Sequence, residues 1–188
     1  MKKFITAVVF ATSVSVSAYA ADTYSIDPNH TFPVFEVNHL GFSTQFGRFN
    51  KTSGTITLDM AAKKGGVDLK IEVASLDMGF PVWNEHMAAD GFFNTAKFPS
   101  MIFKSSKLVF KDGKVVAAEG DFTMLGVTKP LTVTVNDFKC GDHPMLKKPM
   151  CGANISGMIK RSDFGMSKYV PAISDDIKIN VPVEAYKN

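Results

Sequence analysis

Hydrophobic and polar residues alternate along most of the chain. Val67, Leu69 and Ile71 occupy every second position of one segment, with Asp68 and Lys70 between them. The same alternation recurs in residues 55–60, 131–136 and 176–184. A period of two places apolar side chains on one face of a strand and polar side chains on the other. The pattern therefore predicts antiparallel strands with one face towards water.

Turn residues divide these strands at regular intervals. Gly65-Gly66, Asp112-Gly113 and Leu125-Gly126 separate alternating segments, and Asp-Gly is a strong hairpin marker. The expected strands are near residues 22–27, 31–39, 47–60, 66–76, 101–110, 115–124, 130–139 and 152–183, the last span holding two. Regular short strands are typical of a sandwich or a barrel, and closure removes exposed sheet edges. We expect an all-β fold, an extended antiparallel eight-stranded barrel.

One segment breaks the alternation. Residues 82–89 include the helix formers Glu85, Met87 and Ala88, and Gly91 follows them. Glycine commonly follows the last turn of a helix. The sequence therefore predicts one short helix in an otherwise all-β chain.

The N-terminal residues have the three parts of a secretory signal peptide. Lys2 and Lys3 precede an uncharged segment, 4–16, and Ala18 and Ala20 give a small–x–small cleavage site. The apolar segment is shorter than the ~20 residues that span a bilayer, which argues against a membrane anchor. We predict that residues 1–20 are removed and that the mature protein, 21–188, works in the bacterial periplasm.

The mature chain suits a single domain, 21–188, with a net charge near zero. Removal of Lys2 and Lys3 leaves 19 basic residues (21 minus 2) against 18 acidic residues. No basic cluster is present, so the sequence gives no electrostatic reason to expect nucleic-acid binding. Haem-attachment, phosphate-loop and zinc-helix motifs are also missing from the sequence, so we expect no cofactor and no metal.

Cys140 and Cys151 are the two cysteines of the chain. An even pair this close in a secreted protein favours a disulfide, which would stabilise the fold by about 3 kcal/mol. The alternative is a metal site formed by Cys140, His143 and Cys151, but three ligands without a Cys-x-x-Cys pair fit zinc poorly.

His39 is the histidine of greatest interest because it shares a strand face with Phe35 and Val37. An imidazole on the apolar face must find a polar partner. Two interpretations remain open: a core histidine bonded within the protein, or a polar contact for the head group of an apolar ligand. No nucleophile or acid–base partner accompanies it in the sequence, so we do not expect an enzyme.

Phenylalanine is abundant, with 16 in the chain against one tryptophan. These rings could fill an ordinary core, packed to the density of protein interiors. They could also line a cavity, because an eight-stranded barrel is about the size that holds one small ligand. Composition alone does not separate these two alternatives.

Several sequence blocks follow one another in a distinctive order. They include Tyr-Ser-Ile-Asp at 24–27, Phe-Glu-Val-Asn-His-Leu-Gly-Phe-Ser at 35–43, Phe-Phe-Asn-Thr-Ala-Lys-Phe-Pro at 92–99, Leu-Gly-Val-Thr-Lys-Pro at 125–130 and Arg-Ser-Asp-Phe-Gly-Met at 161–166. In this order the blocks resemble the YceI-like family of secreted polyisoprenoid-binding proteins. The resemblance extends over residues 22–185. It implies a lipocalin-like barrel around a hydrophobic tunnel that holds a lipid with an isoprenoid or other long alkyl tail.

The resemblance and the aromatic residues together define the expected tunnel wall. It comprises Phe35, Val37, Phe42, Phe49, Trp83, Phe93, Phe103 and Phe122, with His39 as a polar contact. We therefore expect a periplasmic carrier that binds or sequesters a long-chain lipid. The alternative is a non-enzymatic interaction module with a filled interior, docked on a membrane partner. The resemblance points to a b561-type cytochrome as that partner and to a homodimer. A cavity above ~300 Å³ would favour the carrier.

Overall fold

The computed structural model describes residues 21–188. The predicted signal peptide, 1–20, lies outside the described residues. The described chain is mostly β-structure. Its strands are β1 (Asp22–Ile26), β2 (Val34–His39), β3 (Ser43–Phe49), β4 (Thr52–Asp59), β5 (Lys64–Glu72), β6 (Leu76–Asp77), β7 (Ser100–Lys111), β8 (Lys114–Met124), β9 (Val127–Asp142), β10 (Pro149–Lys160) and β11 (Asp176–Lys187). Short 3-10 helices cover Val73–Ser75 and Arg161–Phe164.

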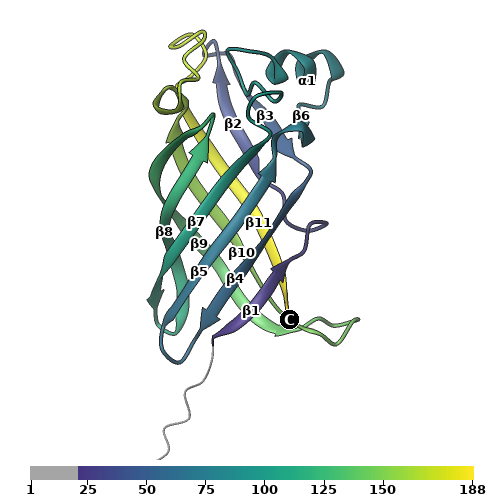
Figure 1. The fold of residues 1–188 in the computed structure, drawn as a ribbon, viewed down its shortest axis with the longest axis vertical. Helices are drawn as coiled ribbons and strands as arrows, with labels where there is room; N and C mark the ends of the chain where they lie inside the picture. The colour runs from purple at the N-terminus through teal and green to yellow at the C-terminus, as the bar shows by residue number, and fades with distance from the viewer. Residues whose placement is uncertain (1–20) are drawn as a thin grey trace, which may run out of the picture.

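The eleven strands form one antiparallel sheet that closes through the pairing of β1 with β11. Both β1 and β2 pair with β11, and their partners β4 and β3 follow one another in the chain. In the same way β5 continues into β6 through the 3-10 helix at Val73–Ser75. Three of the wall strands are thus each split in two, and the wall has eight positions (Figure 1). The predicted eight-stranded antiparallel barrel is confirmed.

The three splits lie side by side and form a seam across the barrel wall. The seam comprises residues 27–33, 50–51 and 73–75. Backbone hydrogen bonds cross it, from Phe49 N to Pro33 O and from Asn50 N to Ser75 O. The prediction of one continuous strand over 47–60 is wrong at this point, because Asn50 and Lys51 leave the regular ladder to make these contacts. Above the seam, β2, β3 and β6 continue the wall.

The single α-helix within residues 21–188 is α1 (Pro81–Ala88), which confirms the predicted short helix to within a residue. Pro81 occupies the first turn, where its missing N–H costs no hydrogen bond. Met78 N donates to Asn84 Oδ1 over 2.7 Å, which ties the chain before the helix to its second turn. The segment 89–99 then leads back to the wall, where Val73 N donates to Pro99 O. No described helix is long and apolar enough to cross a membrane.

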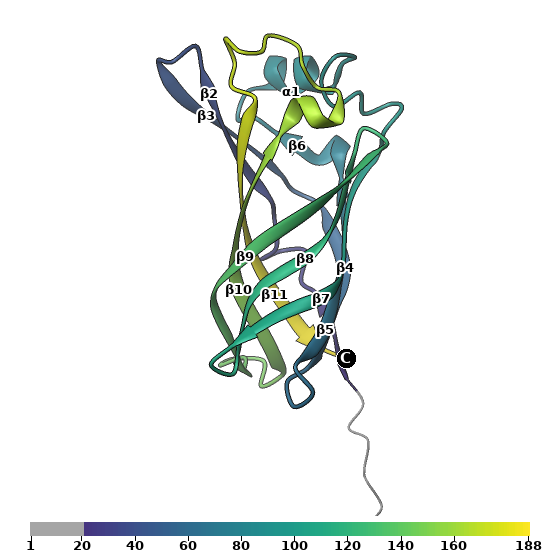
Figure 2. The same cartoon turned by 90° about the vertical axis from the view of Figure 1, so that its left-hand side faces the viewer.

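The two ends of the barrel differ. The helix end holds α1, the β2–β3 turn and the loop 165–175, whereas the disulfide end holds β1, the C-terminus and the turn between β9 and β10 (Figures 1 and 2). Two groups of buried residues follow this division. The larger group contains Phe35, Phe49, Phe93 and Phe103, and the smaller group contains Leu58 and other residues of the disulfide end.

The predicted disulfide is present at the disulfide end. Cys140 and Cys151 are bonded and lie opposite one another in the β9–β10 ladder, with Cα atoms 4.0 Å apart. The alternative metal site with His143 is therefore wrong, because both sulfur atoms are used. His143 Nδ1 instead accepts hydrogen bonds from the N–H groups of Met145 and Leu146 and orders the turn.

Candidate functional site

An apolar cavity of about 440 Å³ runs inside the barrel. Its floor is at the disulfide end, where Leu58, Val115 and Ala185 are almost fully buried. Its mouth is at the helix end, where the lining residues Trp83 and Tyr169 are 40% and 54% exposed. An eight-stranded barrel has a narrow interior, so the space suits a thin, elongated ligand better than a bulky one.

Nearly all of the predicted wall residues line this cavity. The lining includes Phe35, Val37, His39, Phe49, Trp83, Phe93, Phe103 and Phe122. The placement of Phe42 is wrong. It lies in the β2–β3 turn, where Leu40 and Gly41 have positive φ, and its side chain is 91% exposed. The turn reverses the chain, so the alternation of β2 no longer decides the direction of the side chain at position 42.

Three of these rings pack together at one side of the cavity. The Phe49 and Phe93 rings meet edge to face at 5.3 Å between centroids, and Phe35 lies 6.0 Å from Phe49 and 6.1 Å from Phe93. Gly47 leaves room for this packing, because a Cβ there would collide with the Phe35 ring and the Met78 sulfur. The three rings therefore form a fixed part of the wall.

Residues 81–99, which include α1, close the wall beside β6, because β6 does not pair with β7. Phe93 N donates to Met87 O, and this turn directs Phe92 and Phe93 inwards, where both are buried. The His86 ring lies 4.7 Å from the Phe92 ring. Helix α1 itself has no buried residue and rests on these aromatic side chains. The mouth is therefore bounded by a helix whose contacts to the barrel are few.

Most polar side chains of the lining lie near the mouth. They are His39, Gln45, His86, Arg161 and Tyr169. The predicted position of His39 on the face of Phe35 and Val37 is correct, and its strand is bridged there to Ile173. The depth of the cavity offers almost only carbon atoms. The arrangement can accept an apolar tail at depth and a polar group near the entrance, since a buried polar group needs a hydrogen-bond partner.

Arg161 orders the loop at the mouth. It is 4% exposed, and its guanidinium donates to the carbonyls of Met166, Lys168, Ile173 and Ser174 over 2.9–3.0 Å. Burial lowers the pKa of Arg161 and nearby Asp175 acts in the opposite direction, but arginine stays charged in proteins. Its hydrogen bonds fix the loop that carries Tyr169.

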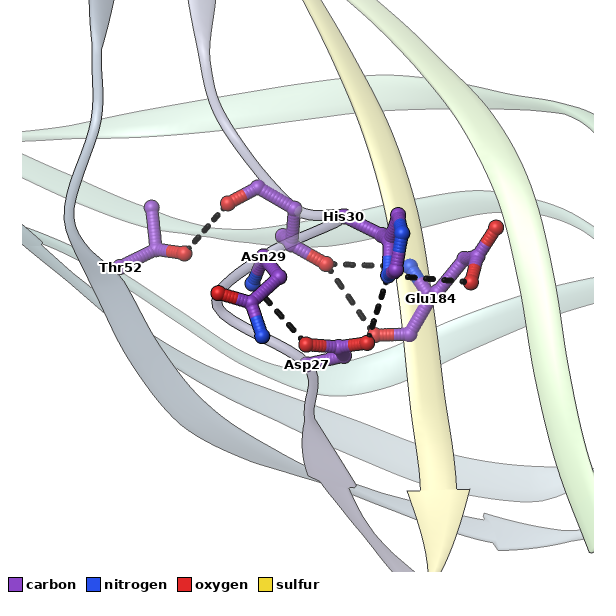
Figure 3. Close-up of polar contacts among 6 residues, drawn as sticks. Asp27, Asn29, His30, Thr52 and Glu184 are labelled. Atoms are coloured by element: carbon purple, nitrogen blue, oxygen red, sulfur yellow. Dashed lines mark hydrogen bonds and ion pairs between the residues drawn. The ribbon is translucent and has the colours of Figure 1, made fainter. Parts of the chain in front are cut away.

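A second polar cluster lies at the seam, outside the cavity lining (Figure 3). His30 Nδ1 lies 2.7 Å from Asp27 Oδ2 and 3.8 Å from Glu184 Oε2. These hydrogen-bond and ion-pair contacts raise the pKa of His30. Burial acts to raise the pKa of Asp27, but the hydrogen bonds from His30 and from Asn29 N outweigh it, and the pKa is lowered.

The same three side chains bring one nitrogen and two oxygen atoms within 4.8 Å of one another, as a metal site would require. The short contact between His30 and Asp27 is that of a charged hydrogen bond, which already uses the Nδ1 atom. Thr31, which is fully buried, donates to Glu184 O and accepts from Glu184 N, and Thr52 Oγ1 donates to Thr31 O. The cluster therefore joins β1, β4 and β11 across the seam.

Sequence reasoning missed several residues of the site. Arg161, Tyr169 and Gln45 line the mouth, but they lie in a 3-10 helix, a loop and a strand, without a distinctive spacing. An available indication was the resemblance block at 161–166, which begins with Arg161. The seam cluster was also missed, although Asp27 and His30 stand three residues apart.

A closed antiparallel barrel with an apolar cavity and a polar mouth defines a lipocalin-like binding barrel. The sequence model of the YceI-like domain family matches residues 24–185 of the chain. The chain therefore belongs to the YceI-like family, as the resemblance implied.

Individual relatives agree with this assignment. Protein YceI of Escherichia coli O157:H7 is 36% identical over 191 residues, which cover 98% of this chain and 97% of that protein. The YceI protein of Campylobacter jejuni superposes with a TM-score of 0.68 at 31% identity, over 80% of this chain and 90% of that one. A polyisoprenoid-binding domain from Saccharophagus degradans, implicated in plant cell wall breakdown, shares the fold, with a TM-score of 0.63 at 17% identity over 88% and 98% of the two chains.

Proposed function

We propose that the mature protein is a periplasmic carrier that binds or sequesters an isoprenoid or other long-chain amphiphilic lipid in the cavity. The observation that carries the proposal is the distribution of polarity along the cavity. Its depth is apolar, whereas His39, Gln45 and Tyr169 lie near the mouth. A molecule with an apolar tail and one polar end matches this arrangement. The polyisoprenoid-binding domain with the same fold supports the choice of lipid class.

The cavity favours the carrier over the interaction module. About 440 Å³ falls within the ~300–1,000 Å³ range of small-molecule sites, whereas the module required a filled interior. The role is one of binding rather than catalysis, because the mouth residues are arranged around an apolar space. A membrane cytochrome of the b561 type and a second copy of the chain remain predicted partners, with no specific observation in their favour.

The energetics of burial make such binding feasible. A tail that buries ~600 Å² of apolar surface gains roughly 15 kcal/mol at ~25 cal/mol per Å². Loss of the free motion of the ligand and ordering of its flexible tail offset a large share of this gain. Micromolar or tighter binding is therefore expected with few polar contacts.

The first test is the identity of what the protein carries. Organic extraction and native mass spectrometry of the protein, purified from its native host without detergent, should reveal a long-chain amphiphile. A mature protein that is always empty, and that takes up neither polyprenyl alcohols nor fatty amides, would contradict the carrier.

Phe103→Ala separates a cavity wall from a packed core. Phe→Ala in a packed core costs about 3–5 kcal/mol of stability. Because the Phe103 side chain faces existing space, we expect a smaller loss, of about 1–3 kcal/mol, and a clear fall in ligand affinity. His39→Ala should weaken binding of ligands with a polar head more than binding of plain hydrocarbons. Urea denaturation of the apo protein and ligand titration measure the two effects. If both variants melt far lower yet bind lipid normally per folded molecule, these side chains belong to the core and not to the ligand site.

A further inference from the structure

Large apolar side chains lie exposed around the mouth of the cavity. The apolar rim, as we call it, comprises Leu40, Phe42, Phe46, Phe80, Val82 and Trp83, which are 40–91% exposed. Leu40, Phe42 and Phe46 belong to the β2–β3 hairpin, and the others belong to the start of α1. Both segments lie at the helix end (Figures 1 and 2). Such a concentration of exposed apolar surface marks an interaction site.

The same loops are almost free of charge. Residues 38–46 and 78–84 contain no Asp, Glu, Lys or Arg, and residues 165–174 contain only Lys168. The chain as a whole is 21% charged. In the turns of the disulfide end the fraction of charged residues is close to this average or higher, and one turn contains Lys111, Asp112 and Lys114. The lack of charge is therefore a property of these three loops, 38–46, 78–84 and 165–174, whose one charged side chain, Lys168, is positive.

Two of the three loops are joined directly by hydrogen bonds, and the third follows β6, which pairs with β3 of the hairpin. Leu40 N donates to Ala172 O, and Ser174 N donates to Asn38 O, which joins the hairpin to the loop 165–175. Arg161 fixes that loop from inside. The rim therefore has a defined shape around the mouth, and five of its six residues do not line the cavity. Their exposure serves no ligand contact inside the barrel.

We propose that the apolar rim docks on the surface of a lipid bilayer, with the mouth of the cavity against the head groups. Phe, Trp and Leu enter the interfacial region of a membrane readily, and binding scales with the apolar area that is buried there. A single lysine and no acidic residue in the loops match zwitterionic and anionic head groups. A protein partner would be expected to meet a polar rim with charged residues. The position of the rim follows from the proposed function, because a water-insoluble ligand leaves and enters a carrier at the membrane.

Vesicle flotation of the mature protein tests the docking directly. The probes are vesicles of phosphatidylcholine alone and of phosphatidylcholine with phosphatidylglycerol. The wild type should float with both, with a modest preference for the anionic vesicles, and added salt should reduce binding only slightly.

The informative variant is Phe42→Ser with Phe80→Ser. Phe42 lies in a turn and Phe80 is the N-cap of α1, where serine is a better cap than phenylalanine, so the fold should be retained. The partition coefficient of this double variant between vesicles and water should fall by roughly tenfold or more. The matched control is Met145→Ser with Leu146→Ser, which removes exposed apolar side chains from the disulfide end and should float like the wild type.

Three results would overturn the docking: no flotation of the wild type, equal flotation of all variants, or equal losses in the rim variant and the control. A wild type that sediments as a dimer without binding vesicles, and becomes a monomer with the rim variant, would assign the rim to contacts between copies instead. Ligand uptake is measured separately in vesicle-free solution. Flotation without ligand uptake would overturn the carrier function but support membrane docking. Ligand uptake without flotation would support the carrier function but overturn membrane docking.

Discussion

At the disulfide end of the barrel the turns are charged and the cavity is closed, whereas at the helix end three loops carry little charge and the cavity opens. Leu58, Val115 and Ala185 fill the disulfide end, and the Cys140–Cys151 bond joins its strands. The helix end is held instead by Arg161 and by aromatic packing around a helix with no buried residue. The barrel thus concentrates its stability at one end and leaves the other accessible to a ligand.

The largest expected effect is that of Arg161→Leu. The substitution leaves four buried or partly buried carbonyls without their donor, and each such group costs about 1–3 kcal/mol. Because water reaches part of the loop, we expect a total loss of about 3–5 kcal/mol. Urea denaturation measures it. Lys160→Ala is the control, since Lys160 forms an exposed ion pair with Asp176, and exposed ion pairs contribute little to stability. Equal stability of the two variants would show that Arg161 does not hold the helix end.

Removal of the disulfide should weaken the opposite end and leave the mouth of the cavity unchanged. Cys140→Ser with Cys151→Ser should cost about 3 kcal/mol, because the bond closes a short loop. Ligand affinity should stay within about twofold, because Cys151 is the one residue of the pair that lines the cavity and most polar side chains of the lining lie at the opposite end. Reductant should destabilise the wild type by a similar amount and leave the double variant unchanged. A large loss of affinity would mean that the two ends are not independent.

The seam cluster should contribute a smaller, pH-dependent stability. The raised pKa of His30 means that its contribution is complete below the unfolded value of ~6.5 and is lost as the pH rises through the folded value. The lowered pKa of Asp27 means that its contribution is present above ~3.9 and is lost as the pH falls through the folded value. Both contributions are present between roughly pH 4 and 6.5.

His30→Gln tests this window. The difference in melting temperature between the wild type and the variant should be largest within it and should shrink on the alkaline side. Lys51→Gln, which removes an exposed ion pair with Glu72 near the same seam, is the control and should show no such profile. A difference that does not depend on pH would contradict the role of the ion pair.

The alternation of residues was sufficient to predict the wall but not its details. Within a strand, Phe35, Val37 and His39 have a fixed direction relative to one another, so their shared face was predictable. Phe42 was not, because a turn with positive φ at Leu40 and Gly41 lies between. The break at Asn50–Lys51 was equally hidden, since the residues on either side alternate normally and the break depends on hydrogen bonds to Pro33 and Ser75. Arg161 is recognisable only once its loop is folded around it.

We describe the cavity as a narrow apolar space with one closed end, and a series of linear primary alcohols of increasing length tests this description. The fluorescence of Trp83, the single tryptophan of the chain, reports binding because it lies at the mouth. Each added methylene should strengthen binding by up to about fourfold, equivalent to ~0.8 kcal/mol, until the tail reaches the floor near Leu58 and Ala185. Affinity should then level off as further carbons remain outside the mouth. An affinity that does not change with tail length, or the absence of any binding, would show that the cavity does not hold an alkyl tail.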